Sequence, residues 1–322
     1  MSAYVVELAA AEFADAAAHA PPVYELTPSA ARTSLEDIQS GPTAKPDVAS
    51  VWLTVEEDGV EVRIRIVKPV GATGLLPVVL YLHGGGWVLG SATTHDRLVR
   101  QLSVGVHAAV VFVDYDRAPE ARYPVAVEQA YAVARWIHRR GAGADLDATR
   151  LAVAGNSAGG NLAAALTILA KQRGDVAFVH QSLYYPVTDA AQNTASYRDF
   201  VDGPYLTAKA MAWFWDAYLP DTARRNEILA SPLRAGIDEL AGLPEAFVII
   251  DEYDALRDEG EAYAHKLIAA GVRCACVRYN ATIHDFMMLN ALRETAAATA
   301  AITQAIDVLH RALKSSPPRR KW

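Results

Sequence analysis

Cysteine is scarce in this 322-residue chain, which contains only two. Cys274 and Cys276 occupy alternate positions of an apolar run, so both thiols would lie on the same face of a strand. Such neighbours rarely form a disulfide, and two buried, reduced thiols predict a cytoplasmic location. Paired cysteine ligands and a His-Glu-x-x-His pattern are also missing, so we expect neither a metal nor another cofactor.

Long hydrophobic runs and an excess of positive charge are missing too. No apolar stretch reaches the roughly 20 residues of a membrane-spanning helix, so no membrane span is expected. Residues 1–20 are Ala-rich but carry Glu7, Glu12 and Asp15, which predicts an amphipathic helix rather than a secretion signal. With 30 Lys and Arg against 37 Asp and Glu, the net charge of −7 argues against a nucleic-acid partner. The basic end, residues 317–322, is expected to be a solvated tail.

Apolar residues, by contrast, make up 52% of the chain, enough to bury one large core. We therefore expect a single domain over residues 1–322, because neither an internal repeat nor a low-complexity linker is present. Strand-like runs occur at residues 51–55, 61–68, 77–82, 108–114, 151–154, 181–185, 246–250 and 272–279. From Pro77 onward they alternate with helical patterns. This alternation predicts an α/β fold with a mostly parallel sheet, flanked by helices, while the first two strands would form an antiparallel edge.

A glycine-flanked serine follows one of these strands. Ser157 lies within residues 155–160 (Gly-Asn-Ser-Ala-Gly-Gly), after the apolar run 151–154 and before a helix-like stretch. A strand, a tight turn and a helix form the context that a nucleophile elbow requires, because glycines let the strand and the helix approach closely. Gly-x-Ser-x-Gly alone is a weak signal, but this context makes Ser157 a candidate nucleophile.

A second glycine-rich turn follows an earlier strand. The run 75–82 leads into His83, three glycines at 84–86, and Trp87. Backbone N–H groups that converge on one point stabilise the negative oxygen of a tetrahedral intermediate. Beside an elbow, this loop is a candidate oxyanion hole, although three glycines alone would indicate only a flexible turn.

The chain also supplies a base and an acid, in the order Ser, acid, His that is typical of α/β-hydrolases. His284 follows the last strand, and several carboxylates follow the strand 246–250. Both positions fall just past strand ends, where the loops of a parallel sheet converge. Asp251, Glu252, Asp254, Asp258 and Glu259 are all candidates for the acid.

These motifs together resemble those of the hormone-sensitive-lipase-like esterases, the α/β-hydrolases marked by a His-Gly-Gly-Gly loop. The resemblance covers most of the chain and includes residues 83–86, 114–115, 118–120, 155–160, 231–233 and 254–260. It implies an eight-stranded α/β-hydrolase fold. It also implies Ser157 as nucleophile, His284 as general base, Asp254 as orienting acid, and oxyanion donors from Gly84, Gly85 and Ala158.

The chain departs from the family pattern beside two of these residues. Asn156 stands before the nucleophile where the family usually has Asp, which removes a charge while it keeps polar atoms for hydrogen bonding. Asp285 stands after the histidine where Gly is common. A solvated Asp285 is the favoured interpretation; pointing inward, it would raise the pKa of His284.

Two stretches, residues 1–48 and 188–232, fit the sheet poorly and are expected to form a helical cap. The second contains Tyr205, Met211, Trp213, Phe214, Trp215 and Tyr218, an apolar set large enough to cover a pocket. Trp87 and Tyr185 are the candidates for pocket walls, and a core position is the alternative for each.

The resemblance implies a serine carboxylesterase that hydrolyses short- to medium-chain acyl esters through an acyl-enzyme. An amidase or deacetylase using the same triad is the alternative within enzymes. A non-catalytic small-molecule receptor is the alternative outside them, and the presence of His284 tells against it. The expected partner is a small-molecule ester, and a homodimer is implied by the resemblance alone.

Overall fold

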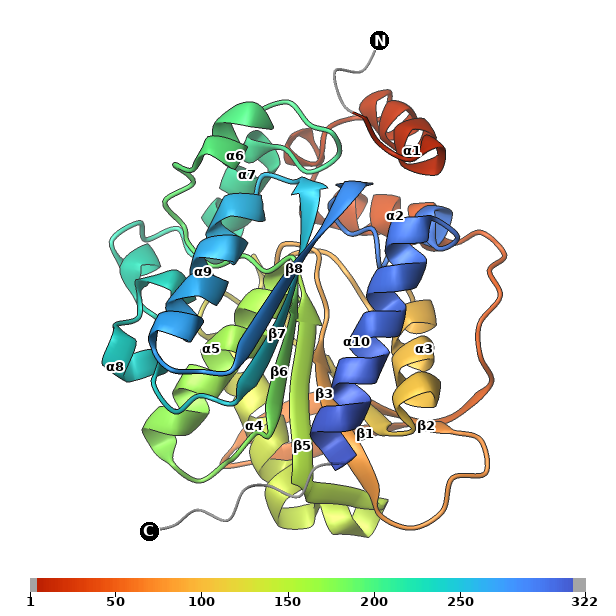
Figure 1. The fold of residues 1–322 in the computed structure, drawn as a ribbon, viewed down its shortest axis with the longest axis vertical. Coiled ribbons are helices and arrows are strands. Elements are labelled where there is room, and N and C mark those ends of the chain that lie inside the picture. The colour runs from red at the N-terminus through yellow and green to blue at the C-terminus, as the bar shows by residue number, and fades with distance from the viewer. Residues whose placement is uncertain (1–4, 315–322) are drawn as a thin grey trace.

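A computed structural model describes residues 5–314, so the expected basic tail lies outside the described residues. Eight strands form one sheet in the order β1-β2-β4-β3-β5-β6-β7-β8 (Figure 1). Their bounds are β1 Val48–Glu57, β2 Val60–Pro69, β3 Leu76–Leu82, β4 Ala109–Asp114, β5 Leu146–Asn156, β6 His180–Tyr184, β7 Glu245–Tyr253 and β8 Cys274–Ile283. β2 pairs antiparallel with β1 and β4, and the other neighbouring pairs are parallel. The predicted fold class and antiparallel edge are confirmed.

Helices cover both faces of the sheet (Figure 1). α3 (Asp96–Val106) and α10 (Ala296–Lys314) pack together on one face, while α4 (Val125–Arg140), α5 (Ala158–Arg173) and α9 (Arg257–Ala269) cover the other. β3, β4 and most of β7 are apolar, because a parallel strand buried on both faces has no solvent side. β8 lies at an edge of the sheet, and most of its residues are partly or fully exposed.

Two groups of the remaining helical segments gather near the carboxyl ends of the parallel strands (Figure 1). Before β1 these are α1 Leu8–Ala18, the short η1 Val23–Glu25 and α2 Pro28–Gln39; after β6 they include α6 Ala195–Asp199 and α7 Ala208–Tyr218. Further along lie η3 Arg224–Asn226, η4 Pro232–Arg234 and α8 Ile237–Leu240; η2 Gly141–Ala144 precedes β5, and η5 Asn290–Leu292 precedes α10. The first two groups fall within the stretches expected to form the cap, of which residues 1–4 are not described.

Two further features bear on the expectations from sequence. Over residues 5–314, no helix combines the length and the apolar character needed to cross a membrane. Cys274 and Cys276 are both free thiols, and each is only partly buried.

Candidate active site

Ser157 occupies a strained turn between β5 and α5. Its backbone angles are φ 54° and ψ −122°, a conformation that a non-glycine residue rarely adopts. The glycines around it are required by close backbone contacts: a Cβ on Gly155 would lie 2.3 Å from the carbonyl oxygen of Gly159, and one on Gly159 would lie 2.0 Å from that of Leu82. The tight turn holds the Ser157 hydroxyl at the start of α5, pointing away from the surrounding backbone.

The structure brings Ser157, His284 and Asp254 into one hydrogen-bonded chain. His284 Nε2 lies 2.9 Å from Ser157 Oγ, and His284 Nδ1 lies 2.7 Å from Asp254 Oδ2. The backbone N–H of Leu256 donates to Asp254 Oδ1 at 3.0 Å, which fixes the carboxylate. All three side chains are buried, and they come from loops that follow β5, β7 and β8. The arrangement leaves the serine proton facing a histidine that is oriented by a carboxylate.

Charges around the histidine set its proton affinity. Burial lowers the pKa of His284, but the negative charges of Asp254 and Asp285 and the hydrogen bond with Asp254 outweigh this, so that its pKa ends above the usual value. Burial raises the pKa of Asp254, but the charge and the hydrogen bond of His284, together with hydrogen bonds from Asp251 and the Leu256 N–H, bring its pKa below the usual value. The pair therefore favours an ionised Asp254 beside an imidazole that accepts a proton readily.

One expected oxyanion donor, the N–H of Gly84, already has partners within the protein. The N–H of Gly84 donates to Asn156 Oδ1 at 3.0 Å and approaches His95 Nε2 at 3.3 Å, so this group is already engaged within the protein. Gly85 and Gly86 have φ of 107° and 60°, and both line the cavity that contains Ser157. Within residues 5–314, no acceptor receives the N–H of Gly85, Gly86 or Ala158. Gly86, which was not among the expected donors, thus replaces Gly84 as a candidate donor.

Sequence alone offers no means of choosing among three successive glycines. The space around each differs: a Cβ on Gly84 would lie 2.4 Å from Asn156 Nδ2, whereas one on Gly86 would lie 2.1 Å from the ring of Phe214 in α7. The first glycine therefore faces the elbow strand, and the third faces the helical segment above the cavity.

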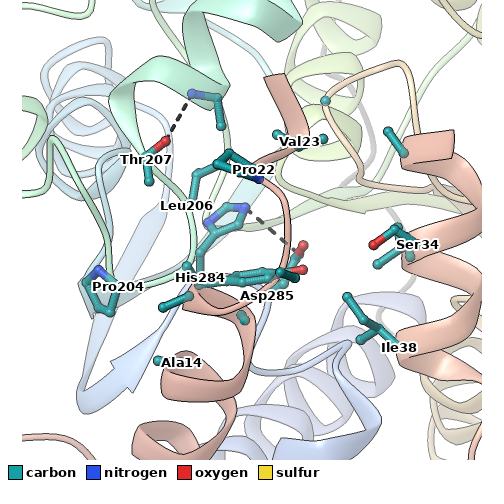
Figure 2. Close-up of a pocket in the computed structure, with 18 of the residues that line it drawn as sticks. Ala14, Pro22, Val23, Ser34, Ile38, Pro204, Leu206, Thr207, His284 and Asp285 are labelled. Atoms are coloured by element: carbon teal, nitrogen blue, oxygen red, sulfur yellow. Dashed lines mark hydrogen bonds and ion pairs between the residues drawn. The ribbon is translucent and has the colours of Figure 1, made fainter. Parts of the chain in front are cut away.

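A cavity of about 530 Å³ opens onto Ser157 and His284. Most of its wall comes from two segments that are far apart in sequence, residues 6–38 and 202–214 (Figure 2). Ala14, Pro22, Val23 and Ile38 line it from the first segment, and Pro204, Leu206, Ala210, Met211 and Phe214 from the second. The wall is mostly apolar, and its size is within the range of small-molecule pockets.

Trp87 and Tyr185 are not part of this wall, contrary to the expectation for both. Trp87 is fully buried, and its ring stacks on Tyr218 of α7 with centroids 4.2 Å apart. It therefore packs the glycine loop against α7. Tyr185 is also fully buried and meets the His284 ring edge to face at 5.1 Å, so it supports the histidine from within the core.

Asp285 points inward, not into solvent as the favoured interpretation had it. It is 6% exposed, lines the cavity, and lies with Oδ1 3.9 Å from His284 Nε2 (Figure 2). Asn156 Nδ2 donates to the same oxygen at 2.9 Å, while Tyr81 Oη donates to Asn156 Oδ1 at 2.9 Å. Burial raises the pKa of Asp285, and His284 and Asn156 oppose this rise. The two residues that depart from the family pattern are thus direct partners.

One cluster has the donor types of a metal site. Atoms of Asp251, Asp254 and His284 lie within 4.8 Å of one another. Both ring nitrogens of His284 already have partners in Ser157 and Asp254, which is the arrangement of a catalytic triad and leaves no nitrogen for a metal. The residues therefore do not fit a metal centre.

Comparison with known proteins agrees with this geometry. Residues 79–288 match the model of a family described as having the alpha/beta hydrolase fold. The carboxylesterase NlhH of Mycobacterium tuberculosis is 36% identical over 88% of this chain and 89% of its own. A solved thermostable esterase from Pseudomonas putida is 44% identical, covers 98% of this chain and all of its own, and superposes with a TM-score of 0.96. One of two fungal esterases from Rhizomucor miehei is 38% identical over 97% of this chain and 98% of its own, with a TM-score of 0.91. The chain therefore belongs to the α/β-hydrolase fold family and, within it, to the hormone-sensitive-lipase-like esterases, which makes it a carboxylic ester hydrolase.

Proposed function

We propose that the protein is a serine carboxylesterase that hydrolyses short- to medium-chain acyl esters through a covalent acyl-enzyme. The observation that supports it most directly is the Ser157–His284–Asp254 chain of hydrogen bonds at 2.9 and 2.7 Å, open to an apolar cavity. In this mechanism Ser157 Oγ attacks the ester carbonyl carbon while His284 Nε2 accepts its proton. Asp254 stabilises the imidazolium that forms.

The negative oxygen of the tetrahedral intermediate would be held by the N–H groups of Gly85, Gly86 and Ala158. All three are free of protein acceptors within the described part of the chain. Collapse of the intermediate breaks the bond to the alcohol, and His284 returns the proton to the leaving oxygen. Water, deprotonated by His284, then attacks the acyl-enzyme, releases the acid and restores Ser157.

The substrate range follows from the cavity. The expected cap stretches contribute residues 6–38 and 202–214 to the cavity wall and would hold the acyl chain, and a volume of about 530 Å³ leaves room for chains of a few to several carbons. An apolar wall favours an alkyl or aryl ester, because burying its apolar surface contributes about 25 cal/mol per Å².

The test is release of p-nitrophenol from p-nitrophenyl acetate, butyrate and octanoate by the wild type, Ser157→Ala and His284→Ala. We expect turnover by the wild type and a loss of at least about a thousandfold in each variant. Thermal unfolding of the variants checks that they fold. Turnover that survives Ser157→Ala would overturn the proposed mechanism.

The same triad can also cleave amides, so one further comparison defines the reaction. Butyryl p-nitroanilide and p-nitrophenyl butyrate share an acyl group and differ in the leaving group. We expect kcat/KM to be far higher for the ester. A comparable rate on the anilide would instead indicate an amidase.

A further inference from the structure

Asp251 is a buried carboxyl group that the proposed mechanism does not use. It lies near the end of β7, is 0% exposed, and neither of its oxygens receives an N–H or hydroxyl proton from the described residues. An ionised carboxylate without partners is very costly inside a protein, so such a group usually stays neutral. A neutral carboxylic acid, in turn, has a proton to donate.

The neighbours of Asp251 show where that proton can go. One oxygen each of Asp251 and Asp254 and a nitrogen of His284 lie within 4.8 Å of one another. Asp254 accepts hydrogen bonds from the Leu256 N–H and from His284, and a carboxylate has lone pairs left for a further donor. Asp254 is therefore the acceptor within reach.

Within residues 5–314, no Lys or Arg side chain pairs with Asp251. Its own backbone N–H favours a negative charge on it, and the His284 ring lies within 4.8 Å. The other groups that face it, besides Asp254, are Asp285, which follows β8 and adds negative charge, and the Tyr185 phenol, which follows β6. On α9, the carboxyl of Glu259 accepts the N–H groups of Thr188 and Asp189. The buried guanidinium of Arg97 donates to the carbonyl oxygens of residues 287–289 and to Asn290.

We propose that Asp251 remains a neutral carboxylic acid while the enzyme is active and donates its proton in a hydrogen bond to Asp254. This inference rests on the proposed role of the triad. Asp251 then acts as a positioning residue: it holds the Asp254 carboxylate toward His284 and reduces its basicity. Burial, together with the charge of Asp254, holds the pKa of Asp251 well above its usual range. Two carboxyl groups that share one proton are a known way of keeping one of them ionised.

The role predicts a specific effect on the histidine. A donor to Asp254 weakens the attraction between this carboxylate and the imidazolium, so it limits the rise in the pKa of His284. Without the donor, the pKa of His284 should rise further. The acid limb of the pH profile, where activity falls as His284 becomes protonated, would then move to higher pH.

The test compares the pH dependence of kcat/KM for p-nitrophenyl butyrate in the wild type, Asp251→Asn and Asp251→Leu. The amide keeps a donor and adds no charge, so the acid limb of Asp251→Asn should stay in place. Leu has a similar size but no donor, and we expect its acid limb to move up by about 0.5 to 1 pH unit. A merely structural role would lower activity without this pattern.

Two outcomes would overturn the proposal. A downward shift in Asp251→Asn would mean that a negative charge had been removed, so that Asp251 was ionised. An unmoved limb in a folded Asp251→Leu would mean that no proton is donated to Asp254.

Infrared difference spectra of the wild type minus Asp251→Asn provide a test that does not depend on activity. A carboxylic acid C=O band assigned to Asp251 at neutral pH is expected, and its absence would contradict the proposal even if Asp251→Leu fails to fold. Failure of the proposed triad appears separately, as turnover that persists in Ser157→Ala.

Discussion

Asn156 Nδ2 donates a hydrogen bond to Asp285 Oδ1 at 2.9 Å, and so joins the residue before the nucleophile to the residue after the histidine. The hormone-sensitive-lipase-like esterases usually have Asp and Gly at these two positions. With Asp at both, two carboxylates would face each other in a buried site, which is unfavourable. Asn156 and Asp285 therefore compensate for one another. This pair of positions keeps one carboxylate, which lies at residue 285 on the cavity wall instead of at residue 156 in the elbow.

The first prediction concerns stability. Asn156→Asp replaces the donor to Asp285 with a second carboxylate, and we expect the free energy of unfolding to fall by about 1–3 kcal/mol. Thermal and urea unfolding measure the change. Adding Asp285→Asn restores a donor and an acceptor with exchanged roles, so the double variant should recover most of the loss. Simple additivity of the two changes would show that the pair is not coupled.

A second prediction concerns pH. Burial lowers the pKa of His284, whereas Asp254 and Asp285 raise it, with a net rise. Asp285→Asn removes one negative charge beside the ring, so the pKa of His284 should fall and the acid limb of kcat/KM should move to lower pH. A pH profile on p-nitrophenyl butyrate checks this. If the limb does not move, Asp285 is protonated in the working enzyme.

The third prediction tests the corrected glycine. Gly86 has φ 60°, and a Cβ there would overlap the ring of Phe214. Gly86→Ala should displace the loop and its N–H, and we expect kcat to fall about a hundredfold or more, as when an oxyanion donor is lost. Phe214→Ala is the matched control, because it changes the same contact without altering the loop. A similar loss in both variants would assign the effect to the contact with α7 rather than to the oxyanion donor.

The fourth prediction concerns chain length. Ala210 of α7 lines the cavity, so Ala210→Phe should fill part of it. We expect kcat/KM to fall strongly for p-nitrophenyl octanoate and little for the acetate. Ala212→Phe lies on the same helix but outside the lining and serves as control. Equal losses on both esters would place the acyl chain elsewhere.

The sequence predicted the sheet, and the resemblance singled out Ser157, His284 and Asp254, which the structure joins by hydrogen bonds. Buried parallel strands leave continuous apolar runs, and a site at their carboxyl ends leaves polar residues just after them, so both are local signals. The orientation of loop side chains is not local. Asp285 turns inward because Asn156, 129 residues earlier in the chain, donates to it. Trp87 turns away from the cavity because Tyr218 stacks on it. The N–H of Gly84 is unavailable to substrate because it donates to the same Asn156.

Most of the cavity wall is built by two segments that contribute no strand to the sheet, residues 6–38 and 202–214, while the hydrogen-bonded Ser157, His284 and Asp254 all follow strands of the sheet. Substitutions in the wall can therefore change which ester fits while the reacting atoms stay in place. Selectivity and chemistry can be altered independently in this chain. A library for new substrates would vary those two segments together, since they share one wall, and would leave the strand ends unchanged.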